Sequence, residues 1–417
     1  MNSTFDRLKY IKVDVHTVDV LIYFICFFFF IRPDYMSGID IIAKTWGFLE
    51  AISVAFVLYF VYRYREFKNL GLWLLIGVYF WLWISTMLNG GTFESYYDDI
   101  RRCLIAMFVT YYGMKYDEER FLKVALMIVV FYTLANLGVM IIHPSGIRMG
   151  NAAGVNGIGE KFFLFGKNTA IKTTGLGVFL MAYYQLRYEG GIGLKSIILS
   201  GVVLVESLIS GSGTSTIVSI ILLAFLFLGV DRMPAFFNAV SGWILNIAFF
   251  FVIIVFQALS RFEYFIVDVM HKDMSFTGRM PLWLGGLLLI SGSPIIGYGS
   301  EPRTVAAAKL GVNNDSMHNF IIDYMYQGGL VMIVLWTIFI LYLAIVIAKM
   351  KDVLIKRLFG LFSFAMMIVW ISEPFSRGRM VTMIILFSLM FTAAGVNVPS
   401  SVTKEKKIKL YRGKKKF

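Results

Sequence analysis

Apolar runs of about 15–22 residues recur along the chain, and they restrict its fold more than any other feature of the sequence. The hydrocarbon core of a bilayer is about 30 Å thick, which a helix of about 20 apolar residues can cross. Backbone hydrogen bonds must be satisfied inside lipid, so helices are favoured for such runs. We therefore expect an all-α integral membrane protein with about 12 transmembrane helices. The predicted helices lie near residues 15–31, 43–62, 71–88, 100–114, 121–142, 168–186, 196–210, 215–230, 238–258, 324–348, 357–372 and 380–396.

The composition agrees with lipid as the solvent for much of this surface. Of the 417 residues, 58% are hydrophobic and 16% are charged, whereas soluble domains average about 45–50% and about 25%. No internal repeat divides the chain, so we expect a single polytopic membrane domain over residues 1–417. Cys26 and Cys103 lie in or beside apolar stretches, outside any metal-ligand spacing, so neither a disulfide nor a zinc site is expected.

The distribution of positive charge predicts the orientation in the membrane. The formal net charge is +13, and cytoplasmic segments of membrane proteins carry an excess of Lys and Arg. When the N-terminus is placed in the cytoplasm, the short segments on that side hold most of the 39 basic residues. An even number of helices then places the C-terminus there too. The basic tail over residues 397–417 holds eight Lys and Arg residues, which we expect to lie on the anionic leaflet rather than on a nucleic acid.

With this orientation, the two long loops face outward. They cover roughly residues 143–167 and 259–323, and the second is the longest stretch that does not span the membrane. Long ordered loops often carry function, so we expect the active site in the loop over 259–323. Within it, Arg279 is followed by Pro281 and Trp283, a pattern that predicts a short helix at the membrane surface.

Two residues of this loop have side chains suited to group transfer. His318 is one of only four histidines, and a neutral imidazole can accept a proton near pH 7. The alternative is a hydrogen-bonded histidine at the membrane interface. The guanidinium of Arg279 keeps its charge, and its planar donors suit phosphate oxygens. The alternative is an arginine that pairs with lipid headgroups.

Besides Arg279, other basic residues in or near the two long outer loops add positive charge to the predicted external face. It lies on the side that the positive-inside rule leaves poor in Lys and Arg. An external anionic substrate is the simplest reason for it, and a pyrophosphate headgroup is one candidate. The residues concerned are Arg148, Lys161, Lys167, Lys172, Arg261, Lys272 and Arg303.

Several chemistries have no matching motif. The chain contains no Asp-x-Asp pair, so the usual metal-binding carboxylates of nucleotide-sugar enzymes are missing. It also lacks a Gly-rich phosphate loop ending in Lys-Ser/Thr, a His-Glu-x-x-His sequence and a Gly-x-Ser-x-Gly sequence. The sequence therefore gives no indication of nucleotide hydrolysis, proteolysis or haem binding, and we expect no cofactor.

Four motif segments, in order and on the predicted outer face, resemble the O-antigen polymerase and O-antigen ligase superfamily. The likeness covers about residues 165–335, while the first 140 residues match only in hydropathy. The motif segments are Gly166-Lys167-Asn168, Ser210–Ser215, Gly278–Trp283 followed by Pro294–Gly299, and His318-Asn319 followed after nine residues by Gly329.

The resemblance implies an all-helical fold of roughly a dozen spans with one large external loop that contains short helices. It implies a metal-independent glycosyltransferase in the bacterial cytoplasmic membrane that moves a glycan from undecaprenyl pyrophosphate to an acceptor. Arg279 would hold the pyrophosphate of the donor, and His318 would act as the base toward the acceptor hydroxyl, or orient it. A chain-length regulator protein is a further candidate partner. The expected substrate-binding residues are Arg148, Lys167, Lys172, Asn168, Asn319, Arg303 and Arg377.

Two positions depart from the family pattern. Gly213 stands where the family often has Arg or Lys, so a second phosphate-binding cation must come from elsewhere or be absent. Arg148, Lys167 and Lys172 are the candidates. Met332 stands where ligases usually carry a small residue or Tyr, which favours a polymerase over a ligase.

Three functions are therefore considered. The first is a polymerase for the repeat units of O-antigen, capsule or exopolysaccharide, and the second is an O-antigen ligase-type transferase. The third is a flippase for the same lipid-linked glycans, which should show repeated halves and ionisable residues at the membrane midplane. Glu50 and Glu206 are the main midspan candidates, although Glu206 equally fits the edge of a site near Ser210–Ser215.

A short external hairpin carries one more group of charges. Glu373, Arg377 and Arg379 lie close together in the sequence, and we expect them to pair with each other or with headgroups. The alternative is that they hold the substrate phosphate.

Overall fold

The computed structural model describes residues 15–31, 33, 40–148, 160–161, 164, 170–258, 279–311, 316–373 and 380–395. Within these residues the protein is almost entirely helical. A two-residue antiparallel ladder joins β1 (Ile147–Arg148) to β2 (Glu160–Lys161). The basic tail predicted over residues 397–417 lies outside the described residues.

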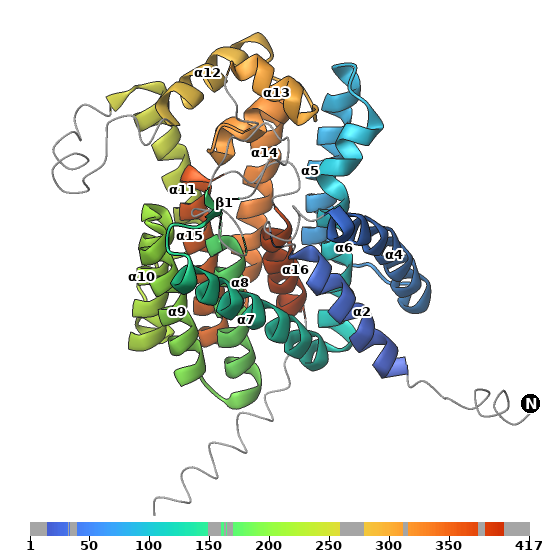
Figure 1. Cartoon of the computed structure of the whole chain (residues 1–417), viewed down its shortest axis with the longest axis vertical. Helices are drawn as coiled ribbons and strands as arrows, with labels where there is room; N and C mark the ends of the chain where they lie inside the picture. The colour runs from blue at the N-terminus through green and yellow to red at the C-terminus, as the bar shows by residue number, and fades with distance from the viewer. Residues whose placement is uncertain are drawn as a thin grey trace, which may run out of the picture.

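The helices form one bundle (Figure 1), in which α14, α15 and α16 lie near the centre. Short π-helical and 3-10 segments continue or connect some of the α-helices. In chain order the elements are α2 (Val15–Phe30), α4 (Asp40–Tyr64), α5 (Leu70–Leu88), α6 (Phe93–Tyr116), α7 (Glu118–Ile142), α8 (Ala170–Tyr184), η2 (Gln185–Glu189), α9 (Leu194–Ser210), α10 (Gly213–Leu228), η3 (Val230–Arg232), α11 (Ala239–Phe249), η4 (Phe250–Val255), α12 (Arg279–Gly292), α13 (Arg303–Leu310), α14 (Phe320–Ala348), α15 (Val353–Ser372) and α16 (Val381–Gly395).

The predicted all-helical fold is confirmed, because each of the twelve predicted ranges falls on a helix. Five helices of the described part are long and apolar enough to cross a membrane. Together with several shorter apolar helices, they define a multi-pass membrane protein, while the number of about 12 crossings stays a prediction. The five helical segments are Lys44–Tyr64, Leu70–Leu88, Glu118–Ile142, Phe320–Ala348 and Val353–Ser372.

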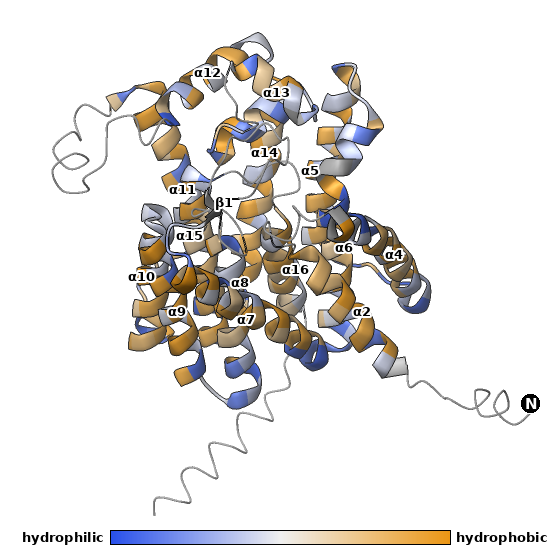
Figure 2. Ribbon diagram, viewed as in Figure 1, coloured by the Kyte–Doolittle hydropathy of each residue, from blue (hydrophilic) through white to orange (hydrophobic). Residues whose placement is uncertain are grey.

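Apolar side chains cover the outside of the bundle as well as its interior. Figure 2 shows hydrophobic residues along the helices and hydrophilic residues gathered at helix ends and connections. Large apolar side chains on the surface include Ile41, 74% exposed, and Leu288, 75% exposed. Such a surface requires lipid as its solvent, since soluble proteins rarely expose large contiguous apolar patches.

The interior is built around a stack of aromatic rings. Phe320, at the start of α14, stacks on Trp370 near the end of α15, with ring centroids 3.9 Å apart and planes only 4° apart. Trp336 and Trp243 meet this pair edge to face. The packing fixes the beginning of α14 against the end of α15, which is where the motif segments meet.

Two ion pairs hold the amino-terminal helices together. Arg63 of α4 donates to Asp19 of α2 at 2.8 Å, and Arg101 of α6 pairs with Glu50 of α4. Glu50 is buried, so its charge needs such a partner. The pair gives Glu50, one of the two midspan acids considered for a flippase, a structural role.

The predicted external loop contains helices, as expected. Its described part includes α12 and α13, which lie at one end of the bundle, whereas the connection from η2 to α9 lies at the opposite end (Figure 1). Helix α12 begins at Arg279 as the Pro281 and Trp283 pattern predicts, and it packs against the beginning of α14, because a Cβ added at Gly286 would meet the side chains of Met317 and Ile322.

Candidate functional site

The end of α15, residues 371–373, is the point where three of the motif segments meet. The Gly278–Trp283 segment contributes Arg279 of α12, and the His318-Asn319 segment contributes Asn319 at the start of α14. The Ser210–Ser215 segment contributes Thr214 at the start of α10. These residues are far apart in the sequence, yet each makes a hydrogen bond or ion pair with the end of α15. We call this place the α15 end.

Arg279 forms an ion pair with Glu373. Its Nη2 donates to the Glu373 Oε1 at 2.8 Å, and the carboxylate is 1% exposed while the arginine side chain is 18% exposed. A buried carboxylate beside a guanidinium makes a strong, charge-assisted hydrogen bond. This contact crosses 94 residues of chain and was not expected from the sequence, while the expected pairing of Glu373 with Arg377 and Arg379 stays a prediction. Arg377 and Arg379 lie outside the described residues.

Asn319 makes two hydrogen bonds in the local structure. Its side-chain oxygen accepts from the backbone N–H of Ile322 at 3.1 Å, as an N-cap of α14. Its Nδ2 donates to the carbonyl of Ile371 at 2.9 Å. Asn319 thus joins the beginning of α14 to the α15 end, a role that the expectation of substrate binding did not include.

Thr214 brings the Ser210–Ser215 turn to the same place. Its hydroxyl lies 2.6 Å from the hydroxyl of Ser372. Helix α10 begins here because Ser212 caps it, accepting from the backbone N–H of Ser215. Gly213 stands in this turn, and a Cβ added there would meet nothing within 4 Å.

His318 is held in an unusual backbone conformation beside this site. Its φ is +50°, a region that residues other than glycine seldom occupy and that clusters at functional sites. The His318 backbone N–H donates to the hydroxyl of Ser316 at 3.2 Å. His318 is half-buried and directly precedes Asn319, the N-cap of α14.

Asp323 fixes the segment that carries His318. This carboxylate is 2% exposed and accepts from the Ser316 hydroxyl at 2.8 Å and from the backbone N–H of Met317 at 2.8 Å. It lies in the first turn of α14, where the helix dipole favours negative charge. Asp323 was not predicted from the sequence, although an acid shortly after the Asn319 cap is a recognisable signal of the first turn of a helix.

The Pro294–Gly299 motif packs against a break in α14. At Gly329 the backbone leaves helical geometry, with φ +64° and ψ −162°. The chain of the motif lies directly against this break, since Leu330 N–H donates to the Pro294 carbonyl and Gly299 N–H to the Gln327 carbonyl, both at 2.8 Å. A Cβ at Gly329 would lie 2.1 Å from the Ile295 oxygen, so only glycine fits.

Helix α5 satisfies the carbonyl groups that the break releases. The Ser85 hydroxyl has one proton to donate and lies 2.5 Å from the Ile296 carbonyl oxygen and 2.8 Å from the Gln327 carbonyl oxygen. Trp81 Nε1 donates to the Gly328 carbonyl at 2.8 Å. Irregular backbone within a membrane protein needs such partners. Since the first 140 residues resembled the family only in hydropathy, no motif pointed to these side chains.

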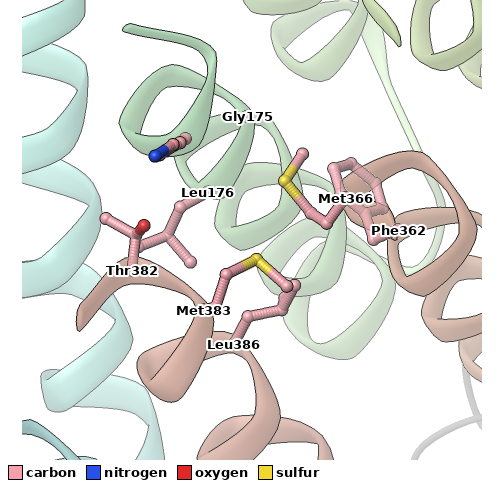
Figure 3. A pocket seen from close by; sticks show the side chains of 8 residues that line it. Gly175, Leu176, Phe362, Met366, Thr382, Met383 and Leu386 are labelled. Carbon is pink, nitrogen blue, oxygen red and sulfur yellow. The ribbon is translucent and has the colours of Figure 1, made fainter. Parts of the chain in front are cut away.

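Lys172 is close to the same end of the bundle. It is 6% exposed on α8, and it lines a narrow gap that also involves Thr382, the second residue of α16. Figure 3 shows Met366, Met383 and Leu176 closing this gap from three helices. The gap is too narrow for a water molecule. The expected contact between Lys172 and substrate stays a prediction.

For the other basic residues predicted to bind substrate, that role stays a prediction. Arg148 pairs through its backbone with Glu160 in the β1–β2 ladder, and Arg303 begins α13, but the side chains of Arg148 and Arg303 are not described. Residues predicted to bind substrate or to add external positive charge also lie outside the described residues. They are Lys167, Asn168, Arg261, Lys272 and Arg377.

Glu206 has a definite structural partner. It is 2% exposed and accepts from Asn136 Nδ2 at 3.0 Å, while Asn136 Oδ1 accepts from the backbone N–H of Leu164 at 3.0 Å. This arrangement ties the root of the first long loop to α7 and α9. Asn136 was not singled out from the sequence.

The fold and these contacts define a class: a multi-pass, all-helical membrane protein with a polar site built where helix ends meet the motif segments. Residues 163–337 match a family model described as O-antigen ligase. The match confirms the resemblance to the O-antigen polymerase and ligase superfamily over the region that contains every motif segment, and it supports a glycosyltransferase-like enzyme that processes glycans at a membrane. No curated protein and no solved structure matches the chain.

Proposed function

We propose that this protein is a polysaccharide polymerase that joins lipid-pyrophosphate-linked oligosaccharide repeat units on the outer face of the bacterial cytoplasmic membrane. The observation that carries the proposal is the meeting of Arg279, Asn319 and Thr214 at the α15 end, within the region that matches the O-antigen ligase model. The repeat unit would belong to O-antigen, capsule or exopolysaccharide.

In this proposal Arg279 binds the pyrophosphate of an undecaprenyl-pyrophosphate-linked donor. Its bond to Glu373 uses Nη2, and a guanidinium has five N–H donors in all, so others remain for phosphate oxygens. Glu373 would fix the direction of the guanidinium. A positive group fixed before the reaction stabilises the charge that develops on the leaving pyrophosphate.

His318 is the proposed base. It takes the proton from the acceptor hydroxyl as the hydroxyl oxygen attacks the anomeric carbon of the donor glycan. The bond from that carbon to the pyrophosphate oxygen breaks, and lipid pyrophosphate leaves with the electron pair. The left-handed backbone at His318 and the Asp323 contacts behind it support a fixed position for the imidazole.

Several other expected residues belong to this proposal. Lys172, Lys167 and Arg148 would contribute the second cation that Gly213 does not supply, and Arg303 and Arg377 would extend the binding surface. Asn168 and Asn319 would border the site. The lipid tail of the donor would remain in the bilayer, and a chain-length regulator protein would act as a partner.

A ligase is the second candidate, because the matched family model is described as O-antigen ligase. Both functions use the same donor, so the residues do not separate them. A strain that lacks the gene separates them: loss of a polymerase leaves single repeat units on the final acceptor, whereas loss of a ligase leaves none.

The test is complementation of that deletion strain, with the glycan profile as the readout. The wild-type gene should restore long chains, and Arg279→Ala and His318→Ala should leave single repeat units. His143→Ala and Arg120→Ala are matched controls, because both side chains are exposed. Each variant must be present in the membrane at the wild-type level. If both site variants restore normal chains, the site is wrong. Complete absence of glycan from the deletion strain favours the ligase.

A further inference from the structure

A cavity lies at the end of α15 opposite to Glu373. It has a volume of about 460 Å³, within the range of ligand sites in proteins. Three parts of the chain enclose it: the segment before and at the start of α11, the last turns of α14 and the first turns of α15. Its lining includes Phe237, Ala344, Ile347, Lys356 and Arg357.

The depth of this cavity corresponds to a bilayer surface. Helix α15 has 20 residues and is about 30 Å long, which is the thickness of a hydrocarbon core. Lys356 and Arg357 lie in its first turns. If the α15 end lies at one surface of the bilayer, these two residues therefore lie at headgroup depth at the other surface. Gly360 lies one turn deeper in the lining, at acyl-chain depth. By the distribution of basic residues, this surface is the cytoplasmic one.

Two cations are fixed at the cavity by backbone carbonyls. Lys356 Nζ donates to the Ala348 carbonyl at the end of α14 at 2.8 Å, and Arg357 Nη1 donates to the Met233 carbonyl. Both side chains are half-buried and part of the cavity lining. Among the residues that line the cavity none is acidic. The cavity therefore has positively charged walls at headgroup depth and apolar walls at acyl-chain depth.

We propose that this cavity binds an anionic phospholipid of the inner leaflet, with its phosphate between Lys356 and Arg357 and one acyl chain along Ala344 and Ile347. Basic pockets between helices on the cytoplasmic side are suited to acidic headgroups. The basic tail over residues 397–417 is a poor alternative occupant, because its eight Lys and Arg residues would be repelled by the two cations. The site is separate from the proposed glycan-transfer site.

The experiment measures lipid retention by the full-length protein in detergent by native mass spectrometry. Phosphatidylglycerol and phosphatidylcholine with identical acyl chains are titrated in parallel. The wild-type protein should bind one phosphatidylglycerol with an affinity at least about tenfold higher than that for phosphatidylcholine. A large excess of inorganic phosphate should leave the lipid bound, because the acyl chain contributes to binding. Equal affinity for the two lipids, or displacement by inorganic phosphate alone, would overturn the proposal.

Matched variants separate the cavity from general surface charge. Lys356→Gln/Arg357→Gln keeps hydrogen-bond donors but removes both charges, and Ala344→Phe fills the apolar part while it leaves the charges in place. Lys349→Gln/Lys351→Gln removes two exposed charges from the same connection, outside the cavity lining. We expect the first two variants to lose the phosphatidylglycerol preference and the control to keep it. An equal loss in the control, or full binding by Ala344→Phe, would show that the cavity is not the site.

Discussion

Arg279 and Glu373 form an ion pair across 94 residues of chain, with 2.8 Å between Nη2 and Oε1. Arg279 begins α12 and Glu373 follows α15, so the pair joins the start of α12 to the end of α15. The carboxylate is 1% exposed and the arginine side chain 18% exposed. The cation assigned to the pyrophosphate is therefore held by a buried acid, a relationship with consequences for both stability and activity.

A double-mutant cycle separates these two consequences. Arg279→Ala should destabilise the protein by about 3 kcal/mol, because it removes a charge-assisted partner of the buried Glu373 carboxylate. Adding Glu373→Gln to that variant should restore part of the stability, since a neutral amide is cheaper to bury. Activity should remain lost in both, because neither has the guanidinium. The measurements are thermal unfolding in detergent and glycan extension.

The control for this cycle is Arg120→Ala. Arg120 is 45% exposed and 3.6 Å from Asp117, so its loss should cost less than about 1 kcal/mol. Strictly additive effects of the two site substitutions on stability would contradict a coupled pair. Activity recovered by Glu373→Gln would contradict the assignment of Arg279 to the substrate.

Asp323→Ala should lower the rate of glycan extension while the substrate KM changes little. Asp323 accepts from the Ser316 hydroxyl and the Met317 N–H, so its loss frees the segment that carries His318. A poorly positioned base lowers kcat, and we expect a loss of about tenfold to a hundredfold. Steady-state kinetics with the purified enzyme give both constants. Asp323→Asn, which keeps one acceptor oxygen, should retain more activity, and an unchanged kcat in Asp323→Ala would rule out this positioning role.

Gly329→Ala should prevent correct folding. The added Cβ would lie 2.1 Å from the Ile295 oxygen, and the φ of +64° is unfavourable for alanine. We expect a stability loss of at least about 2 kcal/mol or no folded protein in the membrane. Gly138→Ala is the matched control, because an added Cβ there meets nothing within 4 Å. Equal melting temperatures for the two variants would show that the packing at the break is not tight.

Chelation should leave the activity unchanged. In the described residues, no three His, Cys, Asp or Glu side chains form a group that could hold a metal ion. The proposed chemistry uses a pyrophosphate leaving group, a guanidinium and an imidazole, none of which requires a divalent cation. The rate of glycan extension should be the same before and after treatment with excess EDTA and dialysis. Loss of activity that Mg²⁺ or Mn²⁺ restores would contradict metal independence.

The sequence predicted those features that depend on local pattern. Each helix that we predicted from an apolar run is present in the structure. The length of such a run follows directly from the thickness of the hydrocarbon core that a helix must cross. Pro281 and Trp283 predicted the short helix that starts at Arg279. The motif segments were found because their residues are close together in the chain, and the family match over 163–337 confirms the resemblance.

The features that depend on long-range packing could not be predicted. Nothing local to Glu373 indicates that Arg279, 94 residues earlier in the chain, is one of its partners. Likewise, Trp81 and Ser85 look like ordinary residues of an apolar helix. Their role follows only from the break at Gly329, whose released carbonyls they satisfy. Hydrophobic periodicity carries no information about such polar contacts.

The central claim is that the residues gathered at the α15 end transfer a glycan from a lipid pyrophosphate. The most direct test incubates the purified protein with an undecaprenyl-pyrophosphate-linked repeat unit, and follows glycan length and released undecaprenyl pyrophosphate. We predict a ladder of products from the wild-type protein, with at least about a hundredfold slower extension by Arg279→Ala and His318→Ala. Extension at the wild-type rate by both variants, or no new glycosidic bond with the wild-type protein, would contradict the account.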